Sequence, residues 1–454
     1  MPKDKENTRF FPDEDLMRQW EEEWQQAEDS ITLQVNALPP VKVLLFAIDT
    51  GAYDAERSLQ ELAALAEANH MLPVAEVSQK RPRPDKATVI GTGRLAEAAL
   101  LAQNLDAEMA VYDGELTGSQ LRNIEKALEI PVIDRTLLIL EIFASRATTH
   151  EGKLQTELAT LEYRLPRLAG LGASLSRQGG GGGGGGGARR GGGEQKLEYD
   201  RRYIRSRISF LKRKLAQTVG RRDETRRTRQ KSGAPVIALV GYTNVGKSSL
   251  INSLTGSEIG VADMLFATLD PTARKWQLPD GQTAILTDTV GFVSRLPHKL
   301  VDAFKSTLEE AAYADLLLKV CDAADPESAE QLRVTDEVLE SLGCKDKPQL
   351  LVYNKCDLAP EALPFDAAAL RVSAKTGEGL PQLRQAVCAL LAQRTAHIQV
   401  LLPYDKLSLS DTLRSYGHIE AEEYRDNGVY FRATLEKTKL YLFEPYLHLN
   451  GGGL

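Results

Sequence analysis

The stretch GYTNVGKSSL, residues 241–250, decides the fold of the central part of this chain. It follows the apolar run PVIALV and precedes INSL, so a strand, a glycine-bounded loop and a helix come in succession. Gly241 to Ser248 match G-x-x-x-x-G-K-[ST], a pattern whose backbone amides bind phosphates at the start of a helix. The stretch therefore predicts a P-loop nucleotide-binding domain of the α/β class.

Individual positions of this loop have expected roles. Backbone amides from Asn244 to Ser249 would bind the phosphates, the Lys247 ammonium would reach the β and γ oxygens, and the Ser248 hydroxyl would ligate Mg²⁺. The predicted nucleotide-binding residues of the loop are Gly241, Tyr242, Thr243, Asn244, Val245, Gly246, Lys247, Ser248 and Ser249.

Two segments downstream are expected to contact the metal and the γ-phosphate. In LTDTVG, Asp288 ends an apolar run and would lie by the metal, and Gly291 would sense the γ-phosphate. FATLDPTARK lies where a mobile switch loop belongs, and its Thr268 would supply a second hydroxyl to Mg²⁺, with Thr272 as the alternative. We therefore predict a catalytic set of Lys247, Thr268, Asp288 and Gly291, and a metal set of Ser248, Thr268 and Asp288.

Base recognition identifies the nucleotide as GTP. LLVYNKCDL ends an apolar run with Asn354, Lys355 and Asp357, and a carboxylate can accept hydrogen bonds from both N1 and the exocyclic amino group of guanine. Adenine offers no such pair of donors, so a polar group would be left unpaired with ATP. VSAKTGEG supplies the residues expected beside the base, which are Ser373, Ala374 and Lys375.

Phe292 follows DTVG at the position where many GTPases carry a glutamine that orients the attacking water. A phenylalanine can orient no water. We therefore expect slow intrinsic hydrolysis, about 10⁻⁴ to 10⁻² per second, that a partner accelerates.

The region from Val41 to Ala147 has the βαβα order of a small parallel sheet with helices on its faces. Strands are expected at 41–48, 74–77, 87–91, 108–113 and 131–135, and helices at 53–69, 93–105 and 116–130. GTG at 91–93 would make a tight turn or, alternatively, bind a phosphate.

A helical hairpin is expected at 151–232, with a glycine-rich tip that contains nine consecutive glycines. Between Lys196 and Lys231 the chain has 14 Lys and Arg against four Asp and Glu, a net charge of about +10. Solvated helix faces normally mix both signs, so this balance favours contact with a polyanion.

The remaining regions complete the predicted organisation: an acidic, disordered extension at 1–40, an N-terminal α/β domain at 41–150, the GTPase domain at 233–397 and a small α+β domain at 398–454. The chain's net charge is −7, and no apolar run reaches the length of a membrane span. We expect a cytoplasmic monomer with reduced thiols at Cys321, Cys344, Cys356 and Cys388.

The motifs FATLDPT, DTVGF, IDRTLLILEIFASRATTHEGKLQTELA and EYDRR together resemble the HflX family of ribosome-associated GTPases, from about Val41 to Tyr446. The resemblance implies a GTPase that binds the large ribosomal subunit, splits stalled or idle ribosomes under stress and leaves after hydrolysis. It implies contacts of the N-terminal domain and hairpin with ribosomal RNA, and a hydrophobic residue at the position of Phe292. It also implies K⁺ near Asn244.

The nine glycines depart from the family's GGIGTRGPGE-like tip, which leaves the tip contacts open. Two other functions stay open at this point. An RNA-remodelling ATPase would need a second nucleotide site around Gly91 to Gly93, and a signalling GTPase would act on proteins instead of ribosomes.

Overall fold

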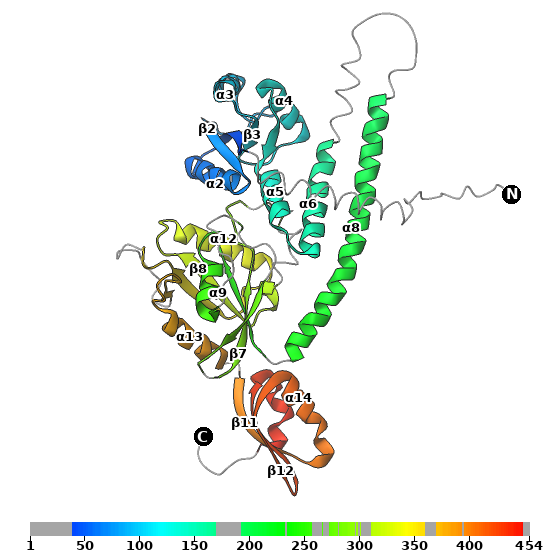
Figure 1. Ribbon diagram of the computed structural model, residues 1–454, viewed down its shortest axis with the longest axis vertical. Helices are drawn as coiled ribbons and strands as arrows, with labels where there is room; N and C mark the ends of the chain where they lie inside the picture. The colour runs from blue at the N-terminus through cyan, green and yellow to red at the C-terminus, as the bar shows by residue number, and fades with distance from the viewer. Residues whose placement is uncertain are drawn as a thin grey trace, which may run out of the picture. The chain divides into compact units, whose positions relative to one another are not determined.

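The structure is a computed structural model that describes residues 39–168, 192–231, 234–256, 266, 272–279, 281–295, 297, 300, 310–358, 369–392 and 395–447. The chain divides into two compact units (Figure 1). The first comprises Met1–Glu141 and Thr160–Lys212, and the second Ile142–Ala159 and Arg213–Leu454. The expected extension at 1–40, apart from its last two residues, lies outside the described residues, and so do residues 170–191 of the glycine-rich tip.

The first unit contains a four-stranded parallel sheet with the order β2-β1-β3-β4. Its strands are β1 (Val41–Asp49), β2 (Met71–Lys80), β3 (Met109–Tyr112) and β4 (Val132–Asp134). The helices α2 (Ala55–Ala68), α3 (Thr92–Asn104) and α4 (Gly118–Leu128) alternate with them. This confirms the predicted parallel sheet. Its inner strands β1 and β3 are apolar except for Lys42 and Asp49 near the ends of β1, because both faces of the sheet are covered.

The prediction of a strand at 87–91 is wrong. Asp85 and Val89 exchange both of their backbone hydrogen bonds, and the Asp85 carboxylate accepts from the amides of Ala87 and Thr88. A tight turn results, and Val89 takes the left-handed conformation with a φ of 65°. Gly91 then caps α3 and donates its N–H to Gln79 Oε1 at 2.7 Å.

Three helices follow the first sheet: α5 (Arg135–Arg146), α6 (His150–Leu168) and α8 (Gly192–Lys231). The sequence predicted α6 and α8 but not α5, whose apolar residues resemble a buried strand. Glu162 of α6 and Lys212 of α8 form an ion pair, with 2.8 Å between Oε1 and Nζ. No helix in the described ranges has the length and apolar character needed to cross a bilayer.

The second unit contains a six-stranded sheet with the order β10-β9-β8-β5-β7-β6. Its strands are β5 (Val236–Gly241), β6 (Ala273–Gln277), β7 (Thr283–Asp288), β8 (Leu316–Asp322), β9 (Gln349–Asn354) and β10 (Leu370–Arg371). All neighbours pair in parallel except β6 and β7, which are antiparallel. The helices include α9 (Lys247–Thr255), α12 (Ser328–Ser341) and α13 (Leu380–Ala392). This architecture confirms the P-loop α/β fold.

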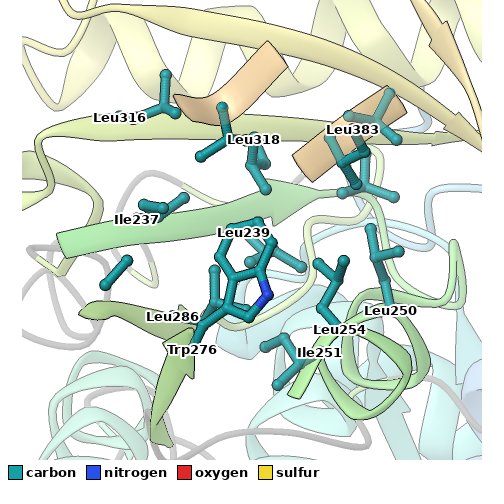
Figure 2. Packing of buried hydrophobic residues seen from close by; sticks show 14 of the residues in the cluster. Ile237, Leu239, Leu250, Ile251, Leu254, Trp276, Leu286, Leu316, Leu318 and Leu383 are labelled. Carbon is teal, nitrogen blue, oxygen red and sulfur yellow. The ribbon is translucent and has the colours of Figure 1, made fainter. Parts of the chain in front are cut away.

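The core of this sheet holds the nucleotide-binding loops in place. Figure 2 shows Trp276 of β6 among the aliphatic side chains of the central strands and of α9. The labelled aliphatic residues are all buried, and they are Ile237, Leu239, Leu250, Ile251, Leu254, Leu286, Leu316, Leu318 and Leu383. Because β5, β7 and β8 enter this core, their carboxyl ends have fixed positions, and the predicted site residues follow those ends.

A three-stranded antiparallel sheet, with the order β11-β13-β12, ends the described chain. It consists of β11 (Thr395–Leu402), β12 (Gly417–Arg425) and β13 (Gly428–Glu436), with α14 (Ser408–Tyr416) and the short helices η1 (Tyr404–Lys406), η2 (Lys437–Leu442) and η3 (Glu444–Tyr446). This order agrees with the small α+β domain expected at 398–454. Arg425 pairs with Gly428, which leaves Asp426 and Asn427 as the loop of the hairpin.

Candidate functional site

Two glycines give the loop between β5 and α9 its shape. Gly241 has a φ of 155°, and a Cβ there would lie 2.2 Å from the carbonyl oxygen of Val320. Gly246 has a φ of 86°, and a Cβ there would lie 2.4 Å from Asn354 Nδ2. Any side chain at either position would collide with its neighbour. The two glycines thus permit the tight path of the loop, which ends at the N-terminus of α9. The free backbone amides at that end of the helix favour the binding of an anion.

Lys247 is the first residue of α9 and is 7% exposed. Its Nζ donates to the carbonyl oxygens of Gly241 at 3.1 Å and Tyr242 at 2.8 Å. Burial lowers the pKa of this amine to about 8, although the nearby Asp288 carboxylate acts in the opposite direction. The ammonium is thus held by the loop itself, next to the place where the phosphates are predicted to bind.

This pKa gives GTP affinity a pH dependence. Phosphates beside Lys247 stabilise its charged form, so GTP binds the protonated amine. Above its pKa of about 8, the free site must take up a proton on binding, and the dissociation constant rises. Between about pH 7 and about pH 9 we expect a roughly tenfold loss of affinity. Titration calorimetry checks this, with Lys247→Arg as a control that stays charged; an equal fall in that variant would contradict the assignment.

Ser248 and Asp288 are brought together from different elements. Ser248 Oγ donates to Asp288 Oδ2 at 2.6 Å, and Asp288, at the carboxyl end of β7, is 1% exposed. A hydroxyl and a carboxylate are ligands that Mg²⁺ prefers, so the donor set fits that ion. Thr268 lies outside the described residues. The alternative ligand Thr272 lies beside Asp288, because its carbonyl accepts from the Asp288 amide at 3.0 Å. Its Oγ1 is buried, with no hydrogen-bond partner among the described residues.

Gly291 lies against the P-loop. A Cβ at this position would be 2.7 Å from Thr243 Cγ2 and 3.0 Å from Lys247 Nζ. Glycine therefore permits the segment after β7 to approach the loop closely. This contact places the predicted γ-phosphate sensor next to the amine predicted to bind the same phosphate.

Phe292 has a structural role that the sequence did not reveal. Its side chain is 1% exposed, and its backbone forms a parallel bridge with Tyr242. The Phe292 amide donates to the Gly241 carbonyl at 3.1 Å, and its carbonyl accepts from the Thr243 amide at 2.8 Å. The segment after β7 is thus joined to the P-loop by backbone pairing, and the aromatic ring is directed into the interior.

We therefore expect Phe292→Leu to change intrinsic GTP turnover only a few-fold, because the leucine keeps an apolar side chain in the interior. Phe292→Ala should lower the free energy of unfolding by about 3 to 5 kcal/mol, as for other buried aromatic residues. Single-turnover hydrolysis and chemical denaturation measure the two effects. A hundredfold slower turnover in the folded leucine variant would show that Phe292 takes part in the chemistry.

Asn354, the last residue of β9, connects the P-loop to the loop at 373–375. It is 1% exposed, its Nδ2 donates to the Val245 carbonyl at 2.9 Å, and its Oδ1 accepts from the Ala374 amide at 3.0 Å. Ser253 Oγ also donates to the Ala374 carbonyl at 2.5 Å. The side chain predicted to contact the nucleotide therefore holds the P-loop and the 373–375 loop together.

The other predicted base-side residues differ in exposure. Lys355 has a φ of 61°, and its Nζ lies 2.8 Å from Asp322 Oδ2. Ser373 is fully buried, and its Oγ accepts a hydrogen bond from the Thr376 amide at 3.1 Å. Asp357 and Lys375 are exposed. Their roles toward the base stay predictions, as do those of the phosphate and metal residues.

Three features define the class of P-loop GTPases. They are a glycine-bounded P-loop, a serine that donates to the buried carboxylate of Asp288, and an asparagine that bridges to the base-side loop. The chain matches family models described as GTP-binding GTPase N-terminal at residues 56–144, GTP-binding GTPase Middle Region at 146–229, and 50S ribosome-binding GTPase at 236–355. It binds guanine nucleotides and hydrolyses GTP.

Curated relatives give the family. GTPase HflX of Caldanaerobacter subterraneus subsp. tengcongensis is 45% identical over 392 residues, which cover 86% of this chain and 90% of that protein. GTPase HflX of Escherichia coli (strain K12) is 40% identical over 377 residues, which cover 82% and 87%. The chain belongs to the HflX family of GTPases.

A solved structure, that of SsGBP in complex with GDP, is 26% identical and matches with a TM-score of 0.45. The match covers 78% of this chain and 99% of that chain.

Proposed function

We propose that this GTPase binds the large ribosomal subunit and its RNA in the cytoplasm, as a monomer. Its GTP form would separate the subunits of stalled or idle ribosomes under stress, and hydrolysis would release it. The description of the matched GTPase family model as 50S ribosome-binding and the HflX relatives support this proposal.

The observation that carries the proposal is the charge of α8. This helix is 40 residues long, and its sequence from Lys196 onward has a net charge of about +10 in a chain of net charge −7. Arg202, Arg205 and Arg213 are exposed on it. A long basic helix suits the phosphate backbone of RNA, and its length exceeds what packing within one small domain requires.

The bound nucleotide would control the binding of the protein to the large subunit through the segment after β7. Gly291 and Phe292 already contact the P-loop, so a γ-phosphate bound there would meet this segment directly. Mg²⁺ held by Ser248, Asp288 and Thr268 would neutralise phosphate charge as the γ-phosphate leaves. Asn244 is exposed with a φ of 60° and would contribute to a K⁺ site; slower hydrolysis in NaCl than in KCl would test that.

Salt dependence of ribosome binding tests the role of α8. If about five cationic residues each neutralise a phosphate, log affinity falls with log salt at a slope of about −4. Replacing Arg202, Arg205 and Arg213 together by glutamine should weaken binding. It should also flatten the slope by about 0.7 to 0.9 for each phosphate that the helix no longer neutralises. Sedimentation with large subunits at several salt concentrations measures both effects.

The matched control replaces the same three arginines by lysine, which keeps the charge and should keep the slope. GTP affinity should be unchanged in both variants, because α8 is not part of the nucleotide site. An unaltered salt slope in the glutamine variant would show that α8 is not part of the RNA-binding surface.

A further inference from the structure

Two tyrosines of α8 are exposed to solvent. Tyr199 is 63% exposed and Tyr203 is 43% exposed. Because they are four residues apart in a continuous helix, they lie on the same side of it, one above the other. Solubility favours charged side chains at exposed positions of a helix, so two adjacent exposed rings need another explanation.

The two tyrosines point away from the interior side of α8. Ile208 and Leu211 are buried and mark that side. At about 100° per residue, Tyr199 lies about 180° around the helix axis from Ile208, and Tyr203 lies about 140° from it. Both tyrosines are at least about 80° away from Leu211. Their exposure therefore follows from their place on the helix.

The neighbouring helix α6 does not extend along this part of α8. The two helices are antiparallel (Figure 1), and Glu162 of α6 forms its ion pair with Lys212 of α8. Because α6 ends at Leu168, six residues after Glu162, it lies beside α8 only back to about residue 206. The earlier residues of α8, which include both tyrosines, extend past the end of α6.

Positive charge surrounds the two rings. Residues 196–212 contain six Lys and Arg against two Asp and Glu, a net charge of +4. Arg202 is exposed and follows Tyr199 by three residues, and Arg207 follows Tyr203 by four, so each ring has a guanidinium as a neighbour on the helix. Exposed rings among cations match a partner that presents both flat apolar faces and negative charge.

Single-stranded RNA has both of these features. Its unpaired bases present flat π faces that stack on aromatic side chains, and its phosphates carry the negative charge. In a duplex the bases stack on one another, so an aromatic side chain can stack only on bases that are unpaired. An apolar protein surface could also cover the rings, but the net positive charge around them favours a polyanion.

We propose, on the basis of the RNA contact proposed above for α8, that Tyr199 and Tyr203 stack on unpaired bases of the bound RNA. The helix then distinguishes single-stranded from double-stranded segments, because its arginines contact the phosphates of either form and its tyrosines contact only unpaired bases. Alanine substitution at a stacking position lowers affinity by about fivefold or more for each base.

Fluorescence anisotropy of the full-length protein tests the stacking. The probe is a labelled RNA of about 12 nucleotides, used as a single strand and annealed to its complement. Tyr199→Ala/Tyr203→Ala should weaken binding of the single strand by about 25-fold or more and leave binding of the duplex within about twofold. The salt slope should not change, because stacking neutralises no phosphate.

Two control variants separate the ring from the rest of the side chain and from its exposure. Tyr199→Phe/Tyr203→Phe keeps both rings and should bind both RNAs as the wild type does. Tyr441→Ala removes a tyrosine that is 62% exposed outside α8, and it should also bind both RNAs as the wild type does.

Three results would overturn the stacking: no binding of the single strand by the wild type, an unchanged single-strand affinity in the alanine variant, or an equal loss for both RNAs. An alanine variant that binds the single strand normally but no longer sediments with large subunits would show that the tyrosines contact a protein instead. Sedimentation of the wild type with large subunits tests ribosome binding separately, so either proposal can fail while the other stands.

Discussion

Replacing Asp357 by asparagine will lower the affinity for GTP by at least about a thousandfold and will favour xanthosine triphosphate instead. The carboxylate follows the carboxyl end of β9 and is exposed, so it is available to accept from N1 and the amino group of guanine. An asparagine amide would place a hydrogen-bond donor against those two donors of guanine. A site whose polar groups do not match a ligand rejects that ligand by a factor of about 10⁴ to 10⁵ relative to the matching one. Xanthine has a carbonyl at that position and restores the complementarity.

Dissociation constants for both nucleotides, measured by calorimetry, test this base assignment. Asp346→Asn is the matched control, because Asp346 is an exposed aspartate outside the candidate site. It should leave the preference for GTP unchanged. Equal GTP affinity in wild type and Asp357→Asn would show that another residue reads the base.

Replacing Lys247 by alanine will weaken the binding of both GTP and GDP by at least about a hundredfold. The change removes a buried ammonium at the start of α9. The loss of each charge-assisted hydrogen bond to a phosphate lowers the binding free energy by about 1.5 to 3 kcal/mol. Two carbonyls of the loop, those of Gly241 and Tyr242, also lose their donor, so the loop itself becomes less ordered.

Fluorescent nucleotide titration measures this effect, and circular dichroism establishes that the variant is folded. Lys345→Ala removes an exposed lysine and should bind both nucleotides as the wild type does. A folded Lys247→Ala protein that binds GDP within about threefold of the wild type would be inconsistent with phosphate binding at this loop, given the energies that such hydrogen bonds supply.

The sequence was sufficient for features determined by near neighbours in the chain. The P-loop between β5 and α9 follows from two glycines and a lysine within eight residues, and the parallel sheets follow from alternating strand and helix patterns. The turn at 85–89 did not follow from the pattern, because the Asp85 side chain competes with strand pairing for the local amides.

Contacts between distant residues were not accessible from the pattern. The Phe292 backbone pairs with a loop about fifty residues earlier, and the Asn354 side chain reaches a carbonyl 109 residues away. Arg135 illustrates the same limit in the first unit. It is 2% exposed and pairs with Asp113 at 3.0 Å and Glu61 at 2.8 Å, 22 and 74 residues away. Each contact depends on tertiary packing, which neither periodicity nor motif spacing encodes.

The central claim, that the GTP form separates ribosomal subunits, is tested most directly by a sucrose gradient of intact ribosomes mixed with the protein. A non-hydrolysable GTP analogue should convert intact ribosomes into separate subunits, with the protein on the large subunit, whereas GDP should leave them intact. The Lys247→Ala variant should leave them intact with either nucleotide. Intact ribosomes that persist equally with the GTP analogue and with GDP would contradict the account.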